Sequence, residues 1–230
     1  MSSMLTYDEL THVDERTGVS LVPYWEADDR VVDRVLAELE RPERTMMFVE
    51  KIGLHSPYHR NLPPDVSYVP RFSTASDRDL DPARERNVLD YVVGVWWRVD
   101  RFFERLLPAL QNSDVLLIYT SDHGQALYDA GFEATNCSGP NAAKGEGLVP
   151  LLVFAGRPSL NDAFRLSADR SFNRATHSEI FPTLLWGMGF DPARVTPAYS
   201  PGLLQPLAKR ARRFFVFSPF TDRMHWVAVE

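Results

Sequence analysis

One stretch of the sequence limits the fold more than any other: an apolar run over residues 114–120 that ends in the motif Ser-Asp-His-Gly, residues 121–124. A buried strand delivers its last residues to the carboxyl edge of a sheet, where α/β enzymes place their sites. Asp122 and His123 offer a carboxylate and an imidazole, which are suitable ligands for one divalent cation. Gly124 lets the backbone turn sharply and approach a ligand closely. The motif therefore predicts an α/β fold with a metal-binding turn at the edge of a sheet.

The spacing of apolar residues predicts a mostly parallel central sheet with flanking helices. Helical spacing is found over residues 28–40, 82–110 and 177–188. Strands are predicted at Thr45–Val49, 114–120, Val149–Phe154, Arg213–Phe217 and Trp226–Val229. The long helix between the first two strands predicts a βαβ crossover, which joins parallel strands. A chain of 230 residues is expected to form a single domain over 1–230.

Composition excludes several classes of partner. The formal net charge is −6 and no basic stripe is present, so a nucleic-acid partner is not expected. The basic segment Lys209–Arg213 is interpreted as a solvated helix end or loop rather than a phosphate-binding patch. A lone cysteine, Cys137, cannot form an internal disulfide and assigns no compartment.

No membrane span or targeting segment is predicted. The sequence contains no uncharged apolar window of about eighteen residues or more. The first residues lack the basic and apolar regions of a signal peptide. The chain is expected to be cytoplasmic if Met1 is the native start, and periplasmic or otherwise extracytoplasmic if it is part of a longer, membrane-anchored protein.

Three histidine-bearing turns follow or flank predicted core elements: His55 with His59, His123, and His177. A single histidine is more often a hydrogen-bonded structural residue than a ligand. Three histidines in such positions, one of them next to Asp122, favour a functional site over three separate structural roles.

Four segments, in this order along the chain, resemble the sulfatase branch of the alkaline phosphatase superfamily. More narrowly, they are similar to the catalytic domain shared by phosphoethanolamine transferases and lipoteichoic acid synthases. The segments are Leu54–Pro63 with its His-Ser-Pro-Tyr-His-Arg run, Thr120–Gly124, Glu146–Phe154 with its Val-Pro strand, and Thr176–Leu185. The resemblance covers residues from about 28 to 190, and it leaves residues 1–27 and a carboxyl-terminal extension, 191–230, unmatched.

The resemblance implies roles for five residues. Asp122 and His123 would bind a divalent metal, whether Ca, Mg, Mn or Zn. His55 would contact the phosphate or sulfate oxygens or protonate the leaving group, and His177 is a further catalytic candidate. Lys144 is a candidate oxyanion contact, although it lies only two residues before Glu146, closer than is usual in sulfatases. The implied substrate is a small-molecule, lipid or glycan ester of phosphate or sulfate, and the charge on its non-bridging oxygens explains the need for a cation.

Parts of the family pattern are missing. No Ser, Thr or modified Cys nucleophile heads a helix before His55, and no first carboxylate ligand precedes it. Cys137 follows the Asp-His pair and lacks the Cys-x-Pro-x-Arg context, while Thr135 and Asn136 stand where the transferases carry a further histidine. We therefore expect the carboxyl-terminal part of a larger enzyme or a truncated homologue, lacking the first strands and with a missing amino-terminal half.

Two ligands alone predict weak metal binding. Tight binding would instead require further ligands, for which the sequence offers Asp8, Asp14, Asp28 and Asp29.

Three functions remain under consideration. The first is a sulfatase-like hydrolase or transferase that works through a covalent enzyme intermediate, with sulfatase and phosphoethanolamine transferase equally favoured. The second is a non-catalytic remnant or partner-binding domain of the same fold. The third, an α/β hydrolase with a Ser-His-Asp triad, is disfavoured because the chain contains no Gly-x-Ser-x-Gly elbow.

Overall fold

The computed structural model describes residues 22–55, 58–63, 85–127, 142–218 and 223–229. The chain forms two compact units, Met1–Leu106 and Leu107–Glu230. The organisation of residues 1–230 as a single domain stays a prediction. In the described residues, no helix is both long and apolar enough to cross a membrane.

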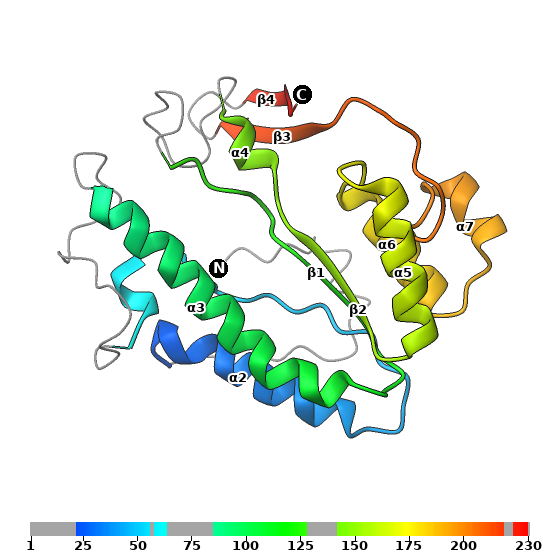
Figure 1. Ribbon diagram of the computed structural model, residues 1–230, viewed down its shortest axis with the longest axis horizontal. Helices are drawn as coiled ribbons and strands as arrows, with labels where there is room; N and C mark the ends of the chain where they lie inside the picture. Colours follow the sequence, from blue (N-terminus) through cyan, green and yellow to red (C-terminus); the bar gives the residue numbers. More distant parts are fainter. Residues whose placement is uncertain (1–21, 56–57, 64–84, 128–141, 219–222, 230) are drawn as a thin grey trace. The chain divides into compact units, whose positions relative to one another are not determined.

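The first unit is built on two long helices, as the helical spacing predicted. They are α2, Tyr24–Leu39, and α3, Glu85–Leu110, whose last four residues belong to the second unit. The apolar stripe of α2 buries Val32 and Val35, and that of α3 buries Phe102 and Leu106. Figure 1 shows the two helices, and a short 3-10 helix, η1 (Tyr58–Asn61), precedes α3 along the chain.

Charged side chains join α2 to α3 within the first unit. The buried Asp28 of α2 lies 2.8 Å from Arg98 Nη2 of α3. Nearer the surface, Asp29 accepts two hydrogen bonds of 3.0 Å from Arg101 Nε. The pairing helps to hold the two helices in register, because each aspartate of α2 meets an arginine of α3.

The predicted strand Thr45–Val49 is wrong. These residues have no regular secondary structure, and Met46 and Phe48 are 52% and 56% exposed. A strand needs a neighbour for its backbone N–H and C=O groups, and an apolar run does not supply one by itself. The βαβ crossover that was predicted to begin here is therefore not observed.

The second unit contains two separate antiparallel pairs of strands. In the first pair, β1 (Leu116–Thr120) aligns Leu116 with Ala155 and Thr120 with Leu151 of β2 (Leu151–Ala155). In the second pair, β3 (Arg213–Ser218) forms a hairpin with β4 (Arg223–Ala228). The α/β class is confirmed, but the expected parallel pairing is wrong for these strands, because β2 begins beside the end of β1 and runs back along it.

The described residues of the second unit also form several helical segments. They are α4, Lys144–Gly147, α5, Pro158–Ser171, η4, His177–Glu179, α6, Ile180–Gly187, and α7, Pro192–Ala198. A small core buries Ala155, Phe164 and Leu203, with Ile118 and Trp186 packed against them. The predicted helix over 177–188 is therefore observed as η4 and α6, whereas α5 and α7 were not predicted.

Candidate functional site

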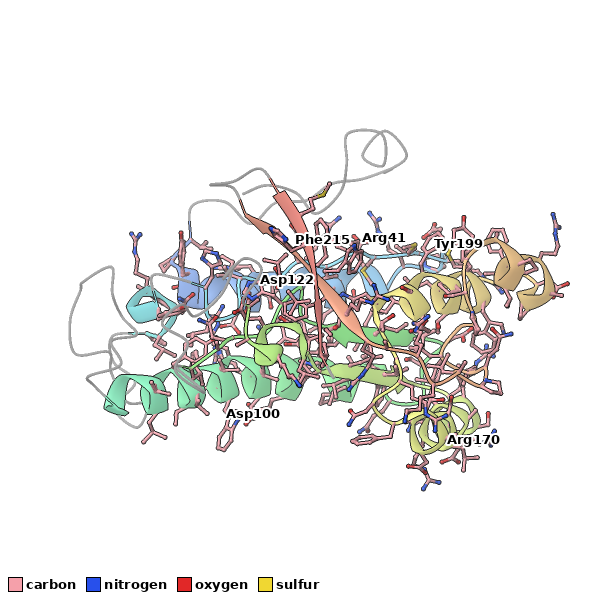
Figure 2. All side chains as sticks on the ribbon, turned by 90° about the horizontal axis from the view of Figure 1, so that it is seen from above. Arg41, Asp100, Asp122, Arg170, Tyr199 and Phe215 are labelled. Atoms are coloured by element: carbon pink, nitrogen blue, oxygen red, sulfur yellow. The ribbon has the colours of Figure 1, made fainter. Side chains whose placement is uncertain are left out.

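The Asp-His turn follows directly from the end of β1. Thr120 is the last residue of the strand, and Asp122 and His123 lie on the irregular backbone that comes next. The side chains are 53% and 45% exposed, respectively. The His123 N–H donates a 3.0 Å hydrogen bond to Asp122 Oδ1, and His123 Nε2 lies 3.9 Å from Asp122 Oδ2. The carboxylate and the imidazole are thus neighbours on an open surface, where Asp122 is labelled in Figure 2.

The backbone around His123 selects the tautomer of its neutral ring. His123 Nδ1 lies 2.7 Å from the carbonyl oxygen of Gly124. A carbonyl oxygen only accepts hydrogen bonds, so Nδ1 carries the proton and Nε2 presents its lone pair. This lone pair is on the nitrogen nearer Asp122 Oδ2, which is the arrangement in which the two side chains could share one cation.

Gly124 places the Asp-His turn directly against α4. The Gly124 N–H donates a 2.7 Å hydrogen bond to Glu146 O. A Cβ added at Gly124 would lie 2.0 Å from Gly145 O, closer than any side chain could approach. The sequence predicted that this glycine permits a close approach to a ligand, and the structure shows a close approach to the backbone of α4.

The α4 turn carries one exposed and one buried charged residue, Lys144 and Glu146. Lys144 begins α4 and is exposed, so its ammonium group is accessible from solvent beside the Asp-His turn. Glu146 is only 4% exposed, and its Oε1 accepts a 3.1 Å hydrogen bond from Ala143 N–H. Glu146 therefore stabilises the start of α4 in the manner of a helix cap.

His177 reaches the end of β1 from a different part of the second unit. His177 Nε2 lies 3.0 Å from Thr120 Oγ1, two residues before Asp122. The Thr120 hydroxyl donates its proton to Pro150 O at 2.9 Å. Because a hydroxyl has a single proton, the ring must donate to Thr120, and His177 Nε2 carries the hydrogen. The sequence did not single out Thr120, whose hydroxyl fixes the position of His177.

A buried carboxylate holds the turn that carries His177. Glu179 is 1% exposed, and its Oε2 accepts a 2.6 Å hydrogen bond from Thr176 N–H. Arg210 Nη2 donates to Glu179 Oε1 at 2.5 Å and to Thr176 Oγ1 at 2.8 Å. The spacing Thr-x-x-Glu before an apolar run is a capping-box signal, so the sequence could have identified Glu179 as the residue that orders this helix start.

The His55 turn belongs to the first unit and is held from both sides. On one side, Asp28 accepts hydrogen bonds from Ile52 N–H at 2.8 Å and Gly53 N–H at 3.2 Å. On the other side, the fully buried Asn61 donates from Nδ2 to His55 O at 2.5 Å. The side chain of His55 is exposed at this anchored turn. Asp28 and Asn61 are residues that the sequence did not connect with His55, because both act through backbone groups of the turn.

The described residues supply an incomplete set of metal ligands. Among them, no group of three or more His, Cys, Asp or Glu could hold a metal ion. Asp122 and His123 offer two donors, whereas zinc takes about four and calcium or magnesium about six. Asp28 and Asp29 are committed to arginines of α3. The other residues considered from the sequence, Asp8, Asp14, Thr135, Asn136 and Cys137, lie outside the described residues, as does the side chain of His59.

Comparisons with known proteins give one family and one fold relative. The family model described as Sulfatase matches residues 5–190. No curated protein matches the sequence. Among solved structures, the chain is similar to the C-terminal periplasmic domain of EcEptC from Escherichia coli, in complex with Zn, with 16% sequence identity and a TM-score of 0.62. The match covers 100% of this chain and 64% of that chain, so this chain spans about two thirds of the length of the domain it resembles.

Proposed function

Because the chain belongs to the sulfatase family, we propose that it is the carboxyl-terminal part of an enzyme that hydrolyses or transfers phosphate or sulfate esters. The observation that best supports this proposal is the open Asp122–His123 pair at the end of β1, with His177 anchored two residues away on Thr120. The Asp-His turn follows the carboxyl end of β1, and the carboxyl ends of strands are where open α/β sheets bind their ligands.

Each residue has a role that its chemistry can fill. Asp122 and His123 Nε2 would supply two ligands of a divalent cation, which when bound would offset charge on the non-bridging oxygens of the ester. Lys144 would contact one of these oxygens, since it is an exposed cation on α4, against which the Asp-His turn packs. His177 Nδ1 would exchange protons with the substrate. For His55, which lies in the first unit, we keep the role that the family resemblance implies: contact with the ester oxygens or protonation of the leaving group.

The reaction would proceed in two steps. A nucleophile from a part of the enzyme not identified in this chain would displace the alcohol of the ester and take up the phosphoryl or sulfuryl group. Water or an acceptor alcohol would then release the group from the nucleophile. Whether the group passes to water or to an acceptor distinguishes a sulfatase from a phosphoethanolamine transferase, and the residues of this chain are compatible with both.

The solved relative guides the choice of metal and location. That relative is a periplasmic domain in complex with Zn. We infer that zinc is the first metal to test here, ahead of Mn, Ca and Mg, and that the enzyme works outside the cytoplasm on a small-molecule, lipid or glycan ester.

The proposal is tested by turnover of p-nitrophenyl phosphate, bis-p-nitrophenyl phosphate and p-nitrophenyl sulfate with each metal, measured for this chain and for the chain extended by the sequence encoded upstream of Met1. The substitutions are compared in whichever of the two turns over a substrate. Asp122→Ala and His55→Ala should each abolish most of the turnover, whereas Asp169→Ala, which removes an exposed carboxylate on α5, should not change it. If the chain turns over a substrate and neither of the first two substitutions slows it, the site assignment is wrong.

A second candidate function is a non-catalytic domain of the same fold. The observation that favours it is the incomplete ligand set of the described residues, together with the absence of a recognisable nucleophile in the sequence. This function predicts no turnover with any metal, and no gain when the chain is extended to include the sequence encoded upstream of Met1. Turnover that appears only in the extended chain supports the enzyme.

A further inference from the structure

The C-terminal hairpin of β3 and β4 has two different faces. Side chains alternate between the faces of a strand, so Arg213 and Phe215 share one face of β3. Their Cα partners on β4 are Ala228 and Trp226. Met224 lies two residues before Trp226 and so shares its face of β4. The hairpin therefore gathers large apolar side chains from both strands on a single face.

The opposite face of the hairpin packs on the second unit. A Cβ added at Gly147 of α4 would lie 2.2 Å from Cδ1 of Phe214, so the phenyl ring rests directly on the backbone of that helix. Val216 and Val229 are 6% and 7% exposed. This packing decides which side of the hairpin is turned to solvent.

The outward face of the hairpin exposes several large apolar side chains to solvent. Phe215, Trp226 and Met224 are 46%, 66% and 70% exposed. The rings of Phe215 and Trp226 meet edge to face with centroids 5.3 Å apart, and Figure 2 labels Phe215 on the hairpin. Three neighbouring large apolar residues on one face form a contiguous patch, and such patches indicate a binding surface.

A basic segment leads into β3, and one of its residues lies on the same face as the aromatic side chains. The segment Lys209–Arg213 has four cationic residues in five positions, in a chain whose formal net charge is −6. Arg210 is committed to Glu179 and Thr176, whereas Lys209 and Arg213 are exposed. Arg213 precedes Phe215 by two residues and so lies on the aromatic face of β3.

We propose that this aromatic and basic face of the hairpin docks on an anionic lipid surface. Trp and Phe side chains insert at the boundary between headgroups and acyl chains, while Lys and Arg pair with anionic headgroups. The charge distribution favours lipid over a second copy of the chain, because two hairpin faces in contact would bring like charges together. The proposal does not depend on the catalytic function, since docking requires only the hairpin and the basic segment.

The test is co-sedimentation of the full chain with vesicles of phosphatidylcholine alone and of phosphatidylcholine with about one third phosphatidylglycerol. Binding is expected only to the anionic vesicles, and it should weaken as salt is raised because the cations are exposed. Arg213→Glu should weaken binding about fivefold or more, since each basic residue near an anionic surface contributes about this factor. Arg170→Glu, which reverses an exposed cation on α5, is the matched control and should bind as the native chain does.

The aromatic contribution is tested separately. Trp226→Ser should weaken binding about tenfold or more through the loss of buried apolar area, whereas Trp226→Phe should retain most of the binding. Phe172→Ser removes a 77% exposed aromatic residue outside the hairpin and should not change binding. Quenching of tryptophan fluorescence by brominated lipid should be strong in the native chain and mostly lost in Trp226→Phe.

Three results would overturn the proposal: equal binding to neutral and anionic vesicles, binding unaffected by both Arg213→Glu and Trp226→Ser, or no binding at all. A concentration-dependent dimer that is lost in Trp226→Ser, without vesicle binding, would instead identify a second copy as the occupant. Because the substituted residues are largely exposed, far-ultraviolet circular dichroism should be unchanged in every variant.

Discussion

Arg98→Met should loosen the turn that carries His55, although Arg98 lies on α3. Arg98 acts on this turn through Asp28, which accepts hydrogen bonds from the turn. Arg98 Nη2 lies 2.8 Å from Asp28 Oδ2, and the two side chains are only 2% and 6% exposed. Arg98 Nη1 also donates a 2.8 Å hydrogen bond to Trp25 O. The substitution would leave the carboxylate that accepts from Ile52 N–H and Gly53 N–H without its main counter-charge.

The expected cost follows from burial. Removing one partner of a buried ion pair costs about 3–5 kcal/mol. Lys51 Nζ remains 3.3 Å from Asp28 Oδ2 and offsets part of the loss, so we expect about 2–4 kcal/mol. Arg101→Met, one turn further along α3, breaks a pair with Asp29 in which the arginine is 48% exposed. This matched control should cost about 1 kcal/mol or less.

The assay is amide hydrogen exchange at Ile52 and Gly53, measured by nuclear magnetic resonance. A loss of about 2–4 kcal/mol corresponds to exchange faster by about 30- to 1,000-fold in Arg98→Met, while Arg101→Met should change it by about fivefold at most. Similar exchange rates in the two variants would refute the reasoning, because they would show that the buried pair does not hold the turn.

Three further predictions concern other parts of the molecule. Gly124→Ala should destabilise the second unit by about 2 kcal/mol or more in urea unfolding, because the new Cβ would lie 2.0 Å from Gly145 O. The control is Gly189→Ala, where the new Cβ meets nothing within 4 Å, so that only the positive φ is strained and the cost should be smaller. Calorimetric titration with Zn, Mn, Ca or Mg should show weak binding that Asp122→Ala removes, and submicromolar affinity would reveal ligands outside the described residues. Burial lowers the pKa of Lys51 below 10.5. Between the lowered pKa and 10.5 the unfolded chain therefore binds more protons than the folded chain, and the free energy of unfolding rises with pH. This rise should be missing in Lys51→Met, and a pH profile of stability that is the same in both proteins would contradict the prediction.

The sequence predicted the helices of the first unit well because their burial is periodic. Val32 and Val35 of α2 and Phe102 and Leu106 of α3 recur every three or four residues, and this spacing records which face each helix buries. The two strands of the hairpin were also located, although not their pairing, since their apolar residues form two short runs of β-branched and aromatic side chains.

Strand pairing could not be predicted in the same way. An apolar run is compatible with a strand of either direction, and it says nothing about whether a neighbour exists. Thus Thr45–Val49 has the composition of a strand but no regular structure, and β1 pairs with β2 in the antiparallel direction. The helix α5 escaped prediction because its buried residues, Phe164, Ser167 and Ser171, include two serines that do not register as an apolar stripe.

The site was predicted in part. The neighbouring position of Asp122 and His123 follows from their adjacency in sequence and from the end of the strand before them. The supporting residues Thr120, Glu179 and Asn61 act through hydrogen bonds to groups distant in sequence or to backbone atoms. Such contacts leave no periodic trace, and only the capping box at Glu179 has a local sequence signature.

The contact between His177 and Thr120 has a consequence for proton transfer. The imidazole donates from Nε2 whether the ring is neutral or positively charged, because Nε2 bears hydrogen in both states. A proton can therefore join or leave Nδ1 without breaking the tether. The ring would keep one orientation whether or not Nδ1 carries a proton.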